Sequence, residues 1–168
     1  MERFQAFSIG RLQFLDSFQF APQSLDKLAA TLKPEDFKHL RRQFPDNNQF
    51  NLLKQKGIFP YDFIDNISKL TTTVPTQFPT QQQFYNKLYD KGVSGRDYEH
   101  GKLVFETCCP SRTLREYHDI YLKTDVLLLA DFFEKYRDTC LEHYGLDPVH
   151  YFSCPGMAFD AALKLSGK

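Results

Sequence analysis

The sequence lacks several features that mark whole classes of protein. No apolar run approaches the roughly 18 residues of a membrane-spanning helix, and the first residues do not have the pattern of a secretory signal. The 21 Lys and Arg residues balance 21 Asp and Glu residues, so neither a general basic field nor an acidic tail indicates a partner. Only 4 cysteines are present, and their spacing fits a reducing compartment better than a disulfide framework. The 168 residues, 42% of them hydrophobic, are enough for one domain with a single core.

The longest helical stretch that the sequence predicts, Thr113 to His143, carries an acidic residue on its apolar face. At roughly 100° per residue, one stripe of this helix contains Leu114, Tyr117, Tyr121, Asp125, Leu128 and Phe132. A charge left there costs several kcal/mol unless it is paired, protonated or bound to a metal. Two interpretations remain open. Asp125 is a salt-bridged or edge-of-core residue, or it is a metal-binding carboxylate with Tyr121 as its helper.

Local signals predict the organisation of the rest of the chain. Two short strands, 4–8 and 12–15, flank a turn at Gly10. The predicted helices are 25–32, 35–43, 81–88, 95–107, 113–143 and 155–168, with loops or irregular connectors at 45–49, 50–63 and 71–83. Ser94 and the Thr113-x2-Glu116 capping box start two of these helices, and Gly145 stops the long one. The first strand and the apolar face of the last helix lack partners, so both ends are expected to be cut from a longer polypeptide.

Cys140, His143, His150 and Cys154 form a quartet of zinc-ligand types near the C-terminus. Their spacing is not one of the strong recurrent zinc patterns, and such a combination arises easily by coincidence. A buried thiol with surface imidazoles is therefore the favoured interpretation.

Four runs of sequence resemble family B DNA polymerases. They are Phe14–Phe20, Lys56–Tyr61, Glu116–Asp131 and Tyr144–Pro148. They are similar to the protein-primed, organellar and viral branch, which is also carried by linear plasmids and by Polinton (Maverick)-type mobile elements. The runs keep their order and span nearly the whole chain. The resemblance implies a fragment of a DNA-directed DNA polymerase that replicates DNA and proofreads it with a 3′–5′ exonuclease.

For the fold, the resemblance implies an α/β structure that is mostly helical in this part. Residues 1–150 would be the second half of an RNase H-like 3′–5′ exonuclease domain, with a short N-terminal β-hairpin and the first half missing. Residues 151–168 would start the connection to the polymerase region. The first two exonuclease motifs, an Asp-x-Glu pair and an Asn followed by an Asp, do not occur before Phe4, and the palm motifs do not follow.

The resemblance also assigns roles to individual residues. Tyr121-x3-Asp125 matches the third exonuclease motif, in which Asp125 binds the two catalytic Mg²⁺ or Mn²⁺ ions and Tyr121 orients the attacking water. Ser17 and Phe18 match a Ser/Thr-Leu motif that contacts single-stranded DNA and the priming protein, with Phe in place of Leu. Lys56 opens a Lys-x2-hydrophobic motif that contacts the primer strand. Since one carboxylate cannot hold two metal ions, the chain alone is expected to bind none tightly and to be inactive.

The implied partners are DNA, as a single-stranded 3′ end or a primer-template, and a priming terminal protein, with no membrane. The implied location is intracellular, in the nucleus or mitochondrion of a eukaryotic host, or viral. Two rival hypotheses stay open. The chain is a non-catalytic DNA- or priming-protein-binding remnant of a mobile element, or a helical protein of unrelated role in which Asp125 is simply paired.

Overall fold

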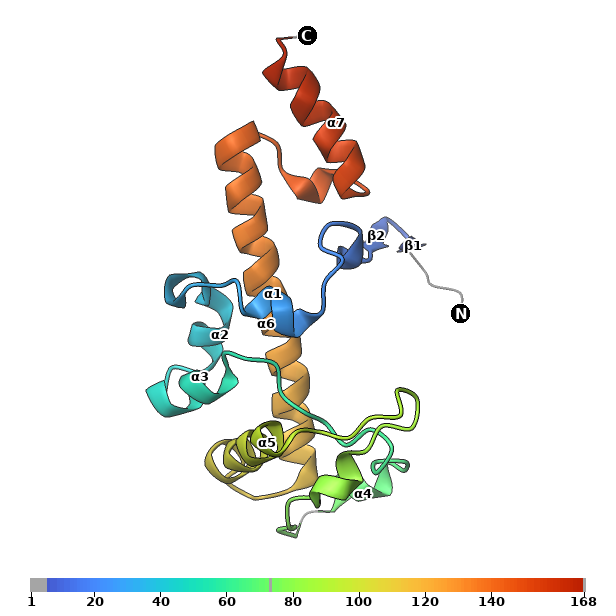
Figure 1. Ribbon diagram of the computed structural model, residues 1–168, viewed down its shortest axis with the longest axis vertical. Helices are drawn as coiled ribbons and strands as arrows, with labels where there is room; N and C mark the ends of the chain where they lie inside the picture. The colour runs from blue at the N-terminus through green and yellow to red at the C-terminus, as the bar shows by residue number, and fades with distance from the viewer. Residues whose placement is uncertain (1–5, 73, 168) are drawn as a thin grey trace.

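The computed structural model describes residues 6–72 and 74–167 of the chain. It is mostly helical, and its one sheet within these residues is a two-stranded antiparallel hairpin. The 31-residue helix α6 (Leu114–Tyr144) forms the axis of the molecule, and the other elements lie along its length (Figure 1). The prediction of a mainly helical chain with an N-terminal hairpin is therefore confirmed.

Helix α6 begins and ends where its local sequence predicts. The Thr113 hydroxyl accepts a hydrogen bond from the Glu116 amide at 3.2 Å, and Gly145 ends the helix in the left-handed conformation with φ at 60°. The Glu116 carboxylate accepts from the Ser111 amide instead of closing the predicted capping box. The predicted stripe faces inward, with three residues buried (Leu114, Tyr117 and Leu128) and three half-buried (Tyr121, Asp125 and Phe132).

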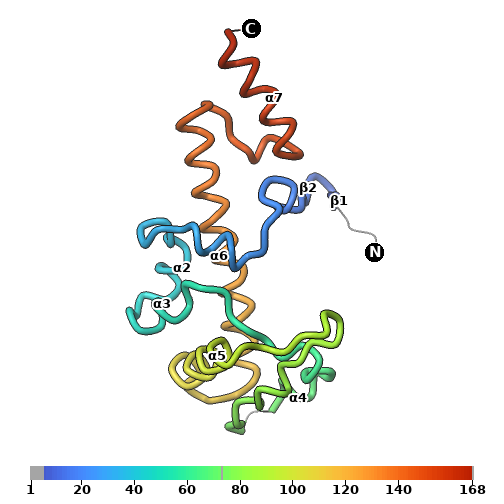
Figure 2. Tube along the Cα trace, in the orientation of Figure 1, coloured from blue at the N-terminus to red at the C-terminus, as the bar shows by residue number. Residues whose placement is uncertain are grey.

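Short helices pack against the middle of α6. Helix α5 (Gly95–Cys108) packs near the N-terminal end of α6 (Figure 2). The short elements that pack against α6 are α1 (Leu25–Ala29), the 3-10 helix η2 (Pro34–Asp36) and α2 (Lys38–Gln43). Helix α3 (Asn47–Leu53) packs against α5 and α2. The predicted helix over 35–43 is divided at Phe37. The predicted loop over 45–49 is wrong, because the Asp46 carboxylate accepts from the amides of Asn48 and Gln49 and caps α3.

A buried carboxylate fixes α2 to α6. Asp131 is 1% exposed and accepts hydrogen bonds from the backbone amides of His39 at 2.7 Å and Leu40 at 3.0 Å. Phe37, the residue before α2, has no side chain that could cap the helix. Asp131 thus caps α2 from another element, which holds the α1–α3 cluster on the axis.

The segment between α3 and α5 is largely irregular and contains α4 (Ser68–Thr71) and η3 (Gln81–Phe84). Only the first turn of the predicted helix 81–88 forms, because Tyr85 is extended and the chain reverses between Asn86 and Lys91. After α6, η4 (Pro148–His150) leads to α7 (Cys154–Leu165). No helix of the described residues is both long and apolar enough to cross a membrane.

The hairpin consists of β1 (Ala6–Ile9) and β2 (Leu12–Leu15), as predicted, although residues 4 and 5 lie outside the described residues. Phe7 pairs with Phe14 and Ile9 with Leu12, so these four side chains share one face. All four are exposed, with the rings of Phe7 and Phe14 stacked at 4.7 Å. The η1 turn (Ser17–Gln19) follows β2.

Candidate functional site

Tyr121 and Asp125 lie one turn apart on α6, where the chain after α3 crosses this helix. Gly57 sits directly on the Tyr121 ring, since a Cβ atom at position 57 would lie 3.3 Å from Tyr121 Cδ2. The hydroxyl of Tyr117 donates to the Ile58 carbonyl at 2.7 Å, one turn earlier on the same helix. These contacts fix the segment that begins at Lys56 beside the predicted motif.

An aromatic cluster surrounds the Tyr121 side chain. The Phe59 ring stacks on Tyr121 with centroids 5.0 Å apart, and the Tyr61 ring meets it edge-on at 6.2 Å. The hydroxyl oxygens of Tyr61 and Tyr121 are 2.6 Å apart. Burial, the hydrogen bond to Tyr61 and the charge of Asp125 hold the pKa of Tyr121 well above its usual value. Tyr121 therefore keeps its proton, and its hydroxyl can act as a donor.

Asp125 is half-buried, and one of its oxygens has no partner. Oδ1 is enclosed without a hydrogen bond, and burial raises the pKa of this carboxyl, against a hydrogen bond from Tyr121 and the charge of Lys56. Within the described residues, Asp125 forms no ion pair. The interpretation of Asp125 as a salt-bridged residue is therefore wrong for this part of the chain. Its interpretation as a residue at the edge of the core agrees with its partial burial.

A small cavity lies beneath the Tyr121 ring, between α3, α5 and α6. Its volume is about 20 Å³, and its walls include His100, Thr124 and Tyr121. His100 Nε2 and Thr124 Oγ1 are enclosed without hydrogen-bond partners, and burial lowers the pKa of His100. Sequence reasoning missed His100 and Thr124, since neither belongs to a recognisable motif.

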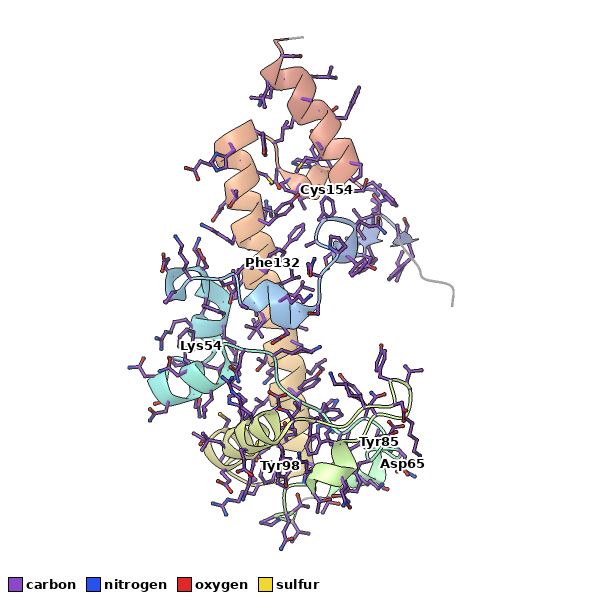
Figure 3. The ribbon with its side chains drawn as sticks, viewed as in Figure 1. Lys54, Asp65, Tyr85, Tyr98, Phe132 and Cys154 are labelled. Atoms are coloured by element: carbon purple, nitrogen blue, oxygen red, sulfur yellow. The ribbon has the colours of Figure 1, made fainter. Side chains whose placement is uncertain are left out.

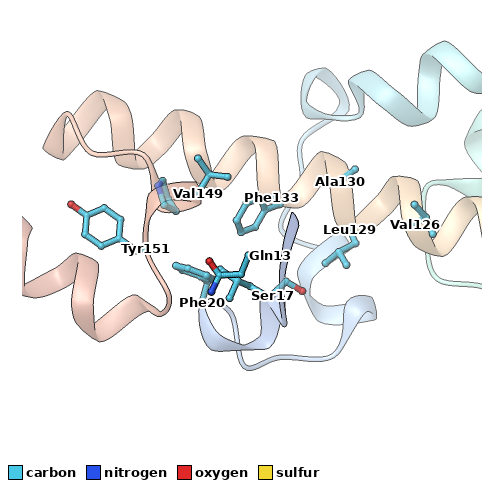
Figure 4. Close-up of a pocket in the computed structure, with 11 residues that line it drawn as sticks. Gln13, Ser17, Phe20, Val126, Leu129, Ala130, Phe133, Val149 and Tyr151 are labelled. Carbon is cyan, nitrogen blue, oxygen red and sulfur yellow. The ribbon is translucent and has the colours of Figure 1, made fainter. Parts of the chain in front are cut away.

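Ser17 and Phe18 lie in η1, which faces α6 on the C-terminal side of Asp125. The Asp16 carboxylate accepts from the Phe18 amide at 3.0 Å and shapes the η1 turn. Ser17 lines an apolar groove of about 440 Å³ between β2, η1, η4 and α6, opposite Leu129 and Phe133 (Figure 4). The structure thus brings Lys56, Tyr121 and Asp125 together. Ser17 lies apart from them, in η1, opposite the next stretch of α6.

The zinc-type quartet is not assembled. Cys140 is 3% exposed and Cys154 is half-buried, whereas His143 and His150 are both exposed. Cys154 Sγ accepts a hydrogen bond from the Tyr136 hydroxyl at 3.9 Å. No group of three or more His, Cys, Asp or Glu side chains in the described part of the chain could hold a metal ion. The favoured interpretation, a buried thiol with surface imidazoles, is confirmed.

A comparison with known protein families identifies the family to which the chain belongs. Residues 4–162 match the family model described as DNA polymerase type B, organellar and viral. The chain belongs to this family. Type B polymerases are DNA-directed DNA polymerases, so this polymerase chain is related to nucleotidyltransferases of DNA replication, and DNA is the implied partner. A search of curated proteins and a search of solved structures gave no match.

Proposed function

We propose that this polymerase chain supplies the third carboxylate motif of a 3′–5′ proofreading exonuclease in the protein-primed branch. Residues 1–150 then form the second half of an RNase H-like domain, and residues 151–168 begin the connection to the polymerase region. The exposed apolar face of the hairpin supports this proposal, because a sheet face with Phe7, Ile9, Leu12 and Phe14 normally packs against another layer.

One observation carries the proposal, the unpartnered Oδ1 atom of Asp125. A carboxylate oxygen that is enclosed, fixed on a long helix and without a protein donor suits a cation as its partner. Mg²⁺ and Mn²⁺ prefer oxygen ligands, so the donor type fits these ions. The described residues supply Asp125 as one ligand of the metal ions, because no group of three or more ligand-type side chains forms around it within these residues.

Each side chain of the site has a defined task in this proposal. When bound, the two metal ions supply a hydroxide nucleophile and stabilise the charge that develops on the scissile phosphate. Asp125 positions the metals, and the protonated hydroxyl of Tyr121 orients the attacking water. Lys56, whose charge already acts on Asp125, faces a phosphate of the primer strand as a point charge.

Ser17 and Phe18 are proposed to contact the single strand or the priming terminal protein. Ser17 lines the apolar groove, and Phe18 is 45% exposed on the adjoining turn. The parent polymerase would act in the nucleus or mitochondrion of a eukaryotic host, or in a virus.

A second candidate is a non-catalytic module that binds DNA or the priming protein, as a remnant of a mobile element. The absence of a three-ligand acidic cluster from the described residues favours it. Excision of a mismatched 3′ nucleotide separates the two candidates, when measured in the polymerase that contains this segment.

The exonuclease proposal predicts that Asp125→Asn reduces excision by a factor of roughly 100 or more, since a metal ligand is lost, while primer extension continues. Asp119→Asn is the matched control, because Asp119 lies on the same helix and, among the described residues, pairs with its neighbours Arg115 and His118. Unchanged excision by the Asp125→Asn polymerase would refute the proposed role.

A further inference from the structure

The chain reverses between Asn86 and Lys91 in a turn that hydrogen bonds hold at several points. The Asn86 amide donates to the Lys91 carbonyl at 2.8 Å, and the Lys91 amide donates back at 3.1 Å. Inside the turn, the Tyr89 amide donates to Asn86 Oδ1 at 3.1 Å. The Lys87 amide donates to Asp62 Oδ2 at 2.9 Å, which ties the turn to the residue after Tyr61.

One residue of the turn is held in a strained conformation. Asp90 has φ at 49°, in the left-handed region that residues other than glycine seldom adopt. Its carboxylate accepts a hydrogen bond from the Tyr85 hydroxyl, which fixes both the turn and the Tyr85 ring. Figure 3 shows Tyr85 near Asp65, in the corner of the molecule beside α4. The turn is thus preorganised, with its shape fixed before any partner arrives.

The two residues at the tip of this fixed turn, Leu88 and Tyr89, have exposed side chains. Leu88 is 76% exposed and Tyr89 is 74% exposed. Lys87 and Lys91 flank them and are themselves exposed. The charge of Lys87 acts on Asp65, and the carboxylates of Asp62 and Asp90 bind the turn from its inner side. A rigid turn that presents an exposed aromatic ring between two exposed lysines has side chains that can contact single-stranded nucleic acid.

A hollow of about 380 Å³ lies beside the turn, lined by Gln81, Gln82, Tyr85, Gly92 and Val93. Its volume is within the range of small-ligand sites, roughly 300–1,000 Å³. The fixed Tyr85 ring offers a stacking surface, and the Gln82 amide offers a donor and an acceptor for the edge of a base. In this hollow a nucleobase could stack on the Tyr85 ring with its edge at the Gln82 amide.

We propose that the 86–91 turn and this hollow bind single-stranded DNA, with Tyr89 stacked on a base and Lys87 and Lys91 facing phosphates. The inference rests on the proposed function, in which the 3′ end of the strand reaches Tyr121. Asp62, which accepts from the turn, is the neighbour in sequence of Tyr61, whose hydroxyl meets that of Tyr121. The proposal therefore assigns to the turn nucleotides of the same strand further from the 3′ end.

The test measures binding of the chain to a fluorescent thymidine oligonucleotide by anisotropy. Tyr89→Ala should weaken binding by about fivefold or more, whereas Tyr89→Phe, which keeps the ring, should bind as the unmodified chain does. Phe159→Ala is the matched control, since Phe159 is 65% exposed on α7. The double variant of Lys87→Ala and Lys91→Ala should reduce the slope of log K against log salt by about 1.4.

Equal affinities of the Tyr89→Ala and Phe159→Ala chains would overturn the proposal and leave the turn as a surface for a protein partner. If Lys56→Ala still weakens binding in that case, the contact of Lys56 with the primer strand remains supported, although the turn does not bind DNA. Conversely, if Tyr89→Ala weakens binding and Lys56→Ala has no effect, the result supports DNA binding by the turn and contradicts the proposed contact between Lys56 and the primer strand. Thermal melts of each variant show whether it is folded, and the exposure of Tyr89 predicts that it is.

Discussion

The hydroxyl oxygens of Tyr61 and Tyr121 lie 2.6 Å apart and join the segment after α3 to helix α6. Tyr61 is 57% exposed, whereas the pKa of Tyr121 is raised by burial and by this bond. If Tyr61 donates to Tyr121, the Tyr121 proton is free to point toward Asp125, whose pKa it lowers. In that arrangement, the exposed phenol of Tyr61 orients the hydroxyl that the proposed chemistry requires.

Replacing Tyr61 with Phe removes this hydrogen bond and keeps the ring contact. We expect a loss of about 0.5–1 kcal/mol in the free energy of unfolding, because the bond is partly exposed. Urea denaturation measures the change. Tyr89→Phe is the control, since the hydroxyl of the exposed Tyr89 has no hydrogen bond to a described residue. Equal stabilities of the two variants would show that the Tyr61–Tyr121 bond contributes nothing.

Asp131 is the buried carboxylate that caps α2 from α6. Asp131→Ala leaves the His39 and Leu40 amides without acceptors in a buried site, so we expect a loss of about 2–4 kcal/mol. Asp138→Ala, which breaks only an exposed pair with Lys38, should cost less than about 1 kcal/mol. Chemical denaturation of both variants tests this, and similar losses would contradict the capping role.

Asp125→Asn should be neutral or stabilising in this chain, by on the order of 1 kcal/mol at pH 7. The folded pKa of Asp125 lies above its usual 3.8, so the charged form is disfavoured in the folded state. The cost is present at pH values above the folded pKa and is relieved as the pH falls through it. The advantage of Asn should therefore shrink in acid. Denaturant melts at pH 7 and pH 4 measure it, and a clear loss of stability at pH 7 would indicate an internal partner for Asp125.

Local signals were sufficient to predict the elements whose ends are set by adjacent residues. Ser94 caps α5 by accepting from the Asp97 amide, and Thr113 and Gly145 limit α6. Helix α3 was missed because its polar first turn resembles a loop, although Asp46 is a good N-cap.

Contacts between distant parts of the chain could not be predicted in this way. Asp131 meets Leu40 across 91 positions, and Tyr61 meets Tyr121 across 60 positions. Tyr121 and Asp125 could be proposed as candidates because helical periodicity places them on an apolar stripe, a strictly local pattern. Tyr61 and His100 acquire their roles only from tertiary packing, for which a single sequence carries no signal.

We propose that Asp125 supplies one ligand of a metal site whose full set of carboxylates is not present among the described residues. A titration of the isolated chain with Mn²⁺, followed by paramagnetic broadening of backbone NMR signals, tests it most directly. The account predicts weak binding in the millimolar range, with broadening centred on Tyr121 to Asp125 and lost in the Asp125→Asn chain. Micromolar affinity that Asp125→Asn abolishes would show a complete site, and broadening that ignores Asp125→Asn would remove this carboxylate from metal binding altogether.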